Sequence, residues 1–375
     1  MAQLFDWLQQ AALPLWWEKG ADRVVGGFHE TLGENGEPTR QNRRARVIGR
    51  QIYVYACATR SGLPGPWCEA AGHGLAFMVS HFVRPDGLIR ATLGPDGEPL
   101  NDDVALYDQA FCLFSLAAAA SAGIDPDGCR ARAEGLADVL ETQWRIPSGG
   151  FIEHDVQKYQ ANPHMHLFEA SLEWEAAGGG ARWTRLADEI AHLAMAHFID
   201  KQGGYLREFF DDQWRPAAGE AGRLIEPGHL FEWSWLMMRW AVLRGREDAA
   251  AVARKMHRIG VLHGVDAARG VAIDSIDSDM QVISGRARLW PQTERIKAAA
   301  ILAQQAQTAE DRSFCEAEVA AGVKGLKLYL QTPVVGSWRD KLNPDGTFLM
   351  EPAPASSLYH IACAILDARA RGYEI

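Results

Sequence analysis

Six short glycine-centred segments recur along the 375-residue chain, and this repeat constrains the fold more than any other feature. Successive segments lie between 54 and 67 residues apart. Glycine permits a tight turn, and the two-residue alternation that follows it predicts a short strand or hairpin. The six segments are GGFHE from Gly26, DGLIR at Gly87, GGFIEH from Gly149, GGYLREFF from Gly203, RGVAID at Gly270 and GSWRD at Gly336.

Each repeat unit also contains two apolar stretches, rich in Ala and Leu, with the spacing of helices. We predict twelve helices in six pairs, over residues 2–19, 40–61, 67–83, 102–122, 127–145, 163–178, 181–200, 229–245, 248–263, 290–306, 310–331 and 355–371. Repeated helix pairs form either an open solenoid or a closed ring. Six units without a polar capping repeat favour closure, so we predict an all-α (α/α)6 barrel with short β-hairpins at one end. An open superhelix that binds other proteins is the alternative.

No linker of low complexity divides the chain, and residues 1–375 are therefore expected to form a single (α/α)6-barrel catalytic domain. The net charge of −10 argues against a partner with a phosphate backbone, which needs a basic face. The six cysteines form no CxxC motif and fit buried free thiols in a reducing compartment. Asp6 and Glu18 interrupt the apolar N-terminal stretch, which reads as an amphipathic helix. We expect a cytoplasmic protein with no nucleic-acid and no membrane partner; a homodimer stays an open alternative.

The polar side chains that suit catalysis gather on every second predicted helix. In a closed ring these helices would form the inner wall, so side chains far apart in sequence would converge on one central cleft. They are Arg50, Tyr107, His164 and His166, His229 with Glu232, Trp290, and His360.

The spacing of these residues allows both catalytic and structural interpretations. His229 and Glu232 lie three residues apart on one helix face, where a carboxylate can fix the tautomer of an imidazole. His164 and His166 lie two apart, so at most one of them faces a given site. In the structural interpretation, His229 caps a helix and Glu232 is solvated. The other histidines would then be core residues whose ring nitrogens are hydrogen-bonded within the protein. Of the thirteen tryptophans, Trp290 and Trp338 lie at repeat junctions and are candidates for stacking on a sugar face.

Several familiar catalytic motifs are missing from the sequence: it contains no glycine-rich phosphate loop, no GxGxxG after a strand, no HExxH and no GxSxG. We expect no cofactor and no metal. Residue types alone leave one alternative, a metal held by His164 or His166 with His229, Glu232 and His360.

Six stretches resemble the N-acylglucosamine 2-epimerase superfamily, in the order found in that family. They are RVIGRQIYVYA, LYDQAF, NPHMHLFEA, EPGHLFEWSWLM, RLWPQTERIKA and SLYHI, and they run from Arg46 to His360. The PGHLFEW and WPQTE stretches look closer to mannose isomerases and acylglucosamine epimerases than to cellobiose epimerases. Ser356 stands where sulfoquinovose isomerases carry Gln, which argues against a sulfonated sugar.

The resemblance implies an (α/α)6 barrel, chemistry without metal and a set of site residues. His360 and His229 match the two acid–base histidines of the family, with Glu232 as the carboxylate associated with His229. The residues that match substrate-binding positions are Arg50, Tyr107, Asn162, His166 and Trp290, with Trp338 as a looser match.

The expected activity is therefore the conversion of a monosaccharide aldose to a ketose, D-mannose to D-fructose, with histidines transferring protons through an enediol. His360 would act as the base at C2, and His229 would act in ring opening and near the sugar oxygens. Epimerisation at C2 of an N-acylated or plain hexose is the first alternative, and a phosphorylated substrate would need basic side chains such as Arg43, Arg44 and Arg46. An (α/α)6 glycoside hydrolase, which needs paired carboxylates, and a non-catalytic scaffold are alternatives from other classes.

Overall fold

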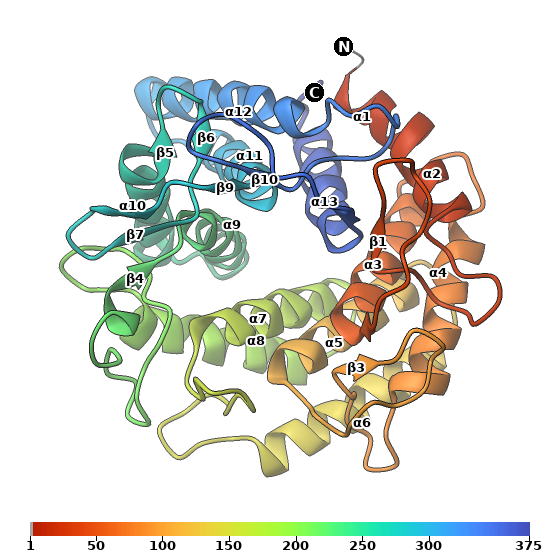
Figure 1. Cartoon of the computed structure of the whole chain (residues 1–375). Helices are drawn as coiled ribbons and strands as arrows, with labels where there is room; N and C mark the ends of the chain where they lie inside the picture. Colours follow the sequence, from red (N-terminus) through yellow and green to blue (C-terminus); the bar gives the residue numbers. More distant parts are fainter. Residues whose placement is uncertain (1–2) are drawn as a thin grey trace.

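Six helices form the inner wall of a ring, and each contacts the next one in chain order. In the computed structural model, which describes residues 3–375, α3 contacts both α5 and α13, so the last helix closes the ring against the first (Figure 1). The inner helices are α3 (Ala45–Arg60), α5 (Leu106–Ser121), α7 (Ala161–Ala176), α9 (Pro227–Arg244), α11 (Trp290–Gln304) and α13 (Ser356–Ala370).

An outer layer of helices covers the inner wall (Figure 1). It consists of α1 (Leu4–Trp7), η1 (Leu8–Ala12) and α2 (Leu13–Glu18), then α4 (Trp67–Phe77) with η2 (Met78–Phe82), α6 (Pro126–Gln143), α8 (Ala181–Leu193) with η3 (Ala194–Phe198), α10 (Glu247–Gly264) and α12 (Ala309–Tyr329). The sequence pattern separates the two layers. Residues 291–303 of α11 are all buried, whereas α8 buries one stripe of residues three and four apart, as expected for a helix with one wet face.

The closed (α/α)6 barrel is confirmed, with a helix at each of the twelve predicted places. The predicted helix over 40–61 begins instead at Ala45, because β2 (Arg43–Arg44) precedes it and pairs with β3 (Thr92–Leu93). Residue 1, where the predicted domain begins, and residue 2, the first residue of the predicted helix over 2–19, lie outside the described residues.

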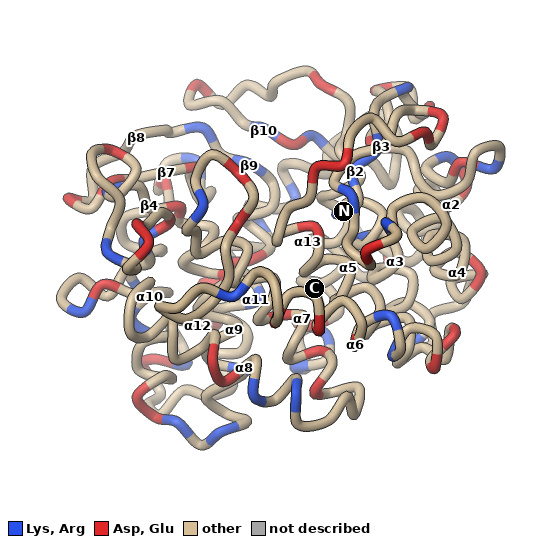
Figure 2. The backbone as a smooth tube through the Cα atoms, turned by 90° about the horizontal axis from the view of Figure 1, so that it is seen from below, with Lys and Arg blue, Asp and Glu red and all other residues tan. Residues whose placement is uncertain are grey.

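Short strands gather at one end of the barrel, where the predicted hairpins lie (Figure 2). Most of them join neighbouring repeat units, and β1 (Thr31–Leu32) pairs with β11 (Ala353–Pro354) to join the first unit to the last. The other pairs are β9 (Ala287–Arg288) with β10 (Lys341–Leu342), and β5 (Val265–Asp266) with β6 (Val271–Ala272). A three-stranded sheet, preceded by the 3-10 turn η4 (Ala221–Arg223), contains β4 (Leu224–Ile225), β7 (Ser275–Asp277) and β8 (Val282–Ser284).

The six glycine-centred segments adopt one repeated turn. Each contains a glycine with positive φ, the region that a side chain disfavours. Three residues after that glycine, a backbone N–H donates to a carbonyl at the end of the preceding outer helix. The six donors are His29, Arg90, Ile152, Arg207, Ile273 and Arg339, and their acceptors are Gly20, Phe82, Trp144, Phe198, Gly264 and Tyr329.

All inner helices begin at the hairpin end, and this direction positions the site. The predicted site residues on these helices lie within the first two turns, from Trp290 at the first position of α11 to Arg50 at the sixth position of α3. None of the helices described over residues 3–375 has the length and apolar character needed to span a membrane.

Candidate active site

A cavity of about 530 Å³ opens at the hairpin end of the barrel. Its walls come from the N-terminal turns of the inner helices and its rim from the hairpin segments. The lining residues are Thr31, Gln41, Arg44, Arg50, Tyr107, Asn162, His166, Glu226, His229, Glu232, Arg288, Trp290, Asp340, Lys341, Glu351, Pro352, Pro354, Ser356, Ser357 and His360. The structure thus brings together eight of the nine predicted site residues, from all six inner helices.

His360 is held by a carboxylate from the neighbouring inner helix α11. Its Nδ1 lies 2.8 Å from Oε1 of Glu294, and both side chains are buried. Burial and the nearby cations of Arg50 and Lys297 keep the pKa of His360 well below its usual value. Since Nδ1–H donates to the carboxylate, Nε2 carries the free lone pair of a neutral imidazole. A neutral histidine in a sugar-sized cavity is suited to act as a base.

His229 has the opposite charge state. Its Nδ1 donates to Oε2 of Glu208 at 3.0 Å. Burial lowers the pKa of His229, but the carboxylates of Glu208 and Glu226 outweigh it and raise the pKa to about 9. His229 is therefore protonated at neutral pH and is suited to act as an acid. Glu232, which we expected beside His229, faces another histidine.

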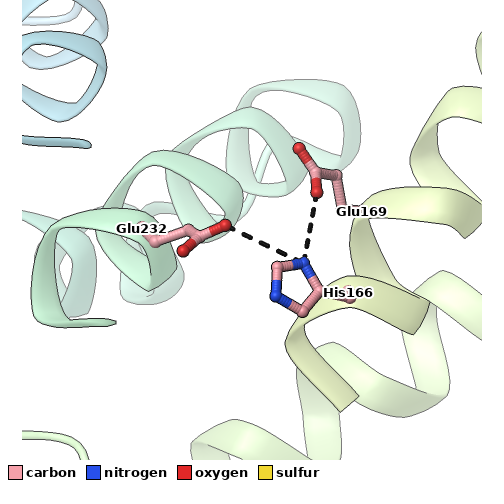
Figure 3. A group of neighbouring side chains, drawn as sticks. All are labelled: His166, Glu169 and Glu232. Carbon is pink, nitrogen blue, oxygen red and sulfur yellow. Dashed lines mark ion pairs between the residues drawn. The ribbon is translucent and has the colours of Figure 1, made fainter. Parts of the chain in front are cut away.

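His166, Glu169 and Glu232 form a buried group between α7 and α9 (Figure 3). Nδ1 of His166 lies 3.5 Å from Oε2 of Glu169 and 3.9 Å from Oε1 of Glu232. Burial lowers the pKa of His166 to about 4, so its ring is neutral. Burial and the charge of Glu294 raise the pKa of Glu232 well above its usual range.

These three residues are also the one group of histidine, cysteine or acidic residues in the described chain with donor atoms close enough together to hold a metal, within 4.8 Å of one another. The hydroxyl of Tyr359 lies 2.7 and 2.6 Å from the two oxygens of Glu169 and occupies that carboxylate. The raised pKa of Glu232 also weakens it as a ligand, because a metal binds the deprotonated carboxylate. Nδ1 of His166 and Oε1 of Glu232 are buried without a hydrogen-bond partner in the described chain, but with Glu169 held by Tyr359 the group lacks three free metal ligands.

The two histidines of the HMH pair have separate surroundings. Nδ1 of His164 contacts the carbonyl of Gln160 at 2.8 Å, and its Nε2 accepts from the backbone N–H of Phe151 at 3.0 Å. Both nitrogens are satisfied, so His164 holds the third hairpin to α7. Only His166 reaches the cavity, in agreement with the prediction that at most one of the pair would do so.

Arg50 supplies a cation inside the cavity. Its Nη2 donates to the hydroxyl of Tyr107 at 2.9 Å, and its guanidinium lies 4.3 Å from the ring centroid of Phe111. No carboxylate of the described residues forms an ion pair with Arg50 within 4.0 Å, and Oδ1 of Asn162 is buried without a hydrogen bond within the chain. These polar groups are available to hydroxyl groups of a ligand.

The two predicted tryptophans differ in position. The ring of Trp290 lies in the cavity, with centroids 5.2 Å from His229 and 5.5 Å from His360. Trp338 does not line this cavity; its ring stacks on Trp16 at 4.6 Å and is 2% exposed. The repeat explains this placement, because Trp338 follows its positive-φ glycine by two residues. The equivalent residues of the other units are all buried and apolar: Phe28, Ile89, Phe151, Leu206 and Ala272.

Sequence reasoning missed Glu208, Glu294, Lys297, Glu169 and Tyr359, which hold the histidines or their carboxylates. A signal existed for Glu208, because it lies four residues after a positive-φ glycine. Four of the other five units have an acidic residue at this position: Glu30, Glu153, Asp274 and Asp340. Glu153, for example, accepts hydrogen bonds from the backbone N–H groups of Leu106 and Tyr107. The position thus supplies acceptors to the N-terminal ends of inner helices.

A solved structure has the same fold. Cellobiose 2-epimerase from Bacillus thermoamylovorans B4167 superimposes with a TM-score of 0.87 over 98% of each chain, at 18% identity.

Curated relatives define the class of protein. The chain is 45% identical to a mannose-6-phosphate isomerase of Rhizobium meliloti (strain 1021), over 97% of this chain and 95% of the relative. It is 25% identical to a D-mannose isomerase of Pseudomonas cannabina pv. alisalensis, over 90% and 88% of the two chains. Together with the barrel, these relatives define a sugar isomerase or epimerase, which replaces the hydrolase and scaffold alternatives. The chain belongs to the N-acylglucosamine 2-epimerase (GlcNAc 2-epimerase) family, whose model matches residues 26–364.

Proposed function

We propose that residues 1–375 act as one catalytic domain that converts D-mannose to D-fructose by histidine acid–base transfer. The observation that carries this proposal is the opposite charge state of two histidines in one cavity. His360 is neutral beside Arg50 and Lys297, and His229 is protonated beside Glu208 and Glu226. Proton transfer next to a carbonyl needs one group that accepts a proton and one group that donates a proton.

The chemistry uses two proton exchanges. After the ring opens, Nε2 of His360 takes the proton from C2 while His229 gives its proton to O1, which leaves a neutral enediol. His360 then returns its proton to C1, and the O2 hydroxyl gives its proton back to His229. The product is the ketose, and both histidines regain their starting states. Arg50 and Tyr107 stabilise the negative charge that develops on the oxygens.

Isomerisation is favoured over epimerisation by the names of the two curated relatives, which are both isomerases. Epimerisation would instead require the proton to return to the opposite face of C2. The family description keeps this as the second candidate function.

The charges around the cavity mouth favour an unphosphorylated sugar, although the 45% identical relative is named for a phosphorylated one. A phosphate dianion would need cations that are free to bind it. The three cations on the rim already have carboxylate partners. Arg44 lies 2.7 Å from Glu30, Lys341 lies 2.9 Å from Glu351, and Arg288 lies 2.8 Å from Glu226 and 2.9 Å from Asp274. Arg43 and Arg46 are paired with Asp22 and Asp108.

Proton NMR of the purified, EDTA-treated protein in D2O tests this function. Fructose signals growing from mannose, with deuterium entering at the exchanging carbon, are the expected result. Mannose 6-phosphate and N-acetylmannosamine are assayed in parallel tubes. Turnover of mannose 6-phosphate alone would overturn the unphosphorylated substrate, and a 2-epimer from any of them would overturn isomerisation. Loss of turnover on EDTA treatment, restored by a divalent metal, would contradict metal-free chemistry.

A further inference from the structure

Lys297 is a fully buried cation directly behind the candidate base. It lies on α11 one turn after Glu294, and its Nζ is 2.7 Å from Oε2 of that carboxylate. The other oxygen of Glu294 accepts from Nδ1 of His360. Both members of the ion pair have no exposed side-chain surface, and Lys297 does not line the cavity. The three residues thus form a chain, Lys297–Glu294–His360, that ends at the cavity.

We propose that Lys297 is a positioning residue that holds Glu294 ionised and thereby fixes the tautomer of His360. This role rests on the proposed function, in which Nε2 of His360 takes the proton. An ionised Glu294 can only accept, so the proton of the imidazole stays on Nδ1 and the lone pair stays on Nε2. A protonated Glu294 could donate to Nδ1 instead. The imidazole would then carry its proton on Nε2 and could not act as a base.

The surroundings explain why a cation is needed at this place. Glu294 lies with Glu169 and Glu232 in one buried acidic group, and burial favours the protonated form of each carboxyl. Tyr359 donates a hydrogen bond to Glu169, and the pKa of Glu232 is raised well above its usual range. Only Glu294 is bonded both to a cation and to His360.

General stability is a weak explanation for this pair. Two charges removed from water cost more free energy than their attraction commonly returns, and apolar replacements are often as stable. The Nζ of Lys297 lies 4.0 Å from the ring centroid of Trp235, and its charged neighbours are Glu294, Glu169 and Glu232. A role at the active site accounts for a fully buried lysine paired with the carboxylate that holds His360.

Other charges near His360 do not replace Lys297. Arg50 on α3 faces His360, but no hydrogen bond or ion pair joins it to Glu294 in the described chain. The other ionisable groups near His360 are His166 and Glu169 on α7, His229 and Glu232 on α9, and Tyr359 on α13. The rest of the cavity lining adds Tyr107, Glu226, Asp340, Glu351 and the cations Arg44, Arg288 and Lys341, which are paired with other carboxylates. None of them is a permanent cation paired with Glu294, the carboxylate that accepts from His360.

The test is the tautomer of His360, observed by ¹⁵N NMR of histidine-labelled protein and assigned with His360→Asn. We expect the Nδ1–H tautomer in the unchanged protein and in Lys297→Arg, which keeps the charge. Lys297→Met should shift His360 toward the Nε2–H tautomer. It should also lower kcat at least about a hundredfold, because a catalytic histidine held in the wrong tautomer cannot take up the proton. Lys297→Gln, a polar neutral replacement, should give the same result and serves if the Met variant fails to fold.

A matched control lies on the same helix. Arg295 is 3% exposed and pairs with Glu318 on α12 at 2.6 Å, away from the cavity. Arg295→Met also removes a buried cation, but it should lower only the melting temperature. A variant of Lys297 that loses turnover while His360 keeps Nδ1–H would show a structural role and overturn the proposal. If the Lys297 variants show the tautomer shift but the unchanged protein acts on no sugar, the proposed function is wrong and the positioning role of Lys297 is still supported.

Discussion

Glu208 accepts a hydrogen bond from Nδ1 of His229 at 3.0 Å, although the two residues belong to different parts of the fourth repeat unit. Glu208 comes from the hairpin segment, and His229 lies in the first turn of α9. Since Glu208 is 3% exposed, its charge is poorly screened and acts strongly on the imidazole.

This pair predicts how activity depends on pH. The raised pKa of His229, about 9, means that turnover should fall as the pH rises through that value, because the acid loses its proton. Glu208→Gln removes the largest source of the raised pKa and should move this loss of turnover to lower pH, by about one unit or more. The measurement is kcat/KM against pH. Glu30→Gln changes the equivalent acidic residue of the first unit, which bonds Arg44, and should leave the alkaline side of the profile in place.

His360→Asn should abolish the exchange of the C2 proton with D2O, with a loss of about a thousandfold or more. His164→Asn is the matched control, because His164 is as buried but bonds only backbone groups. This control should lower the melting temperature and leave the kcat of the folded fraction unchanged. Exchange at an undiminished rate in His360→Asn would rule out His360 as the base at C2.

Trp290 and Trp338 should give opposite results. Trp290→Leu removes the aromatic ring between His229 and His360 and should raise KM about fivefold, since stacking contributes about 1 kcal/mol. Trp338→Leu should leave KM unchanged and lower the free energy of unfolding by about 2 kcal/mol or more, because it removes the stack on Trp16. Initial rates against mannose and urea unfolding measure the two effects. A raised KM in Trp338→Leu would contradict the placement of this ring in the core.

Two glycines of the repeated turn should differ in their tolerance of alanine. Gly150 has φ +74°, and an added Cβ would lie 2.7 Å from Leu193 and 2.8 Å from Nε2 of His164. Gly270 has φ +72° with open space around it. Gly270→Ala should cost about 1–2 kcal/mol of stability from backbone strain alone, and Gly150→Ala should cost more. Urea unfolding measures the loss of unfolding free energy in both variants. Equal losses would mean that Leu193 and His164 move away from the added Cβ at Gly150 without cost.

The barrel could be predicted from the sequence because its repeating pattern of turns and helices lies within each short stretch of the chain. Each unit repeats a glycine turn and two helices, so the helix count and the inner position of alternate helices follow from spacing. The placement of His166 rather than His164 needed the family resemblance, because both satisfy the same helical pattern. The error at Trp338 was avoidable, since the equivalent residue is buried in every other unit.

The partners of the histidines were beyond this reasoning. Glu294 is 66 residues from His360, and Glu208 is 21 residues from His229. Which carboxylate meets which imidazole depends on the rotation of neighbouring inner helices and on the hairpin layer. Helical spacing and the family resemblance both placed Glu232 with His229, whereas the packing of α7 against α9 places Glu232 beside His166.

All inner helices begin at the hairpin end, so only that end carries the site. Insertions in the connecting turns therefore have different consequences at the two ends of the barrel. The turns at the opposite end, such as the Gly178–Gly179–Gly180 connection between α7 and α8, contribute no residue to the cavity. Added β-carbons at Gly178 and Gly180 would meet nothing within 4 Å. Descendants of this chain could gain insertions or fused modules there without disturbing the chemistry, whereas the hairpin loops can vary only in ways that suit the sugar.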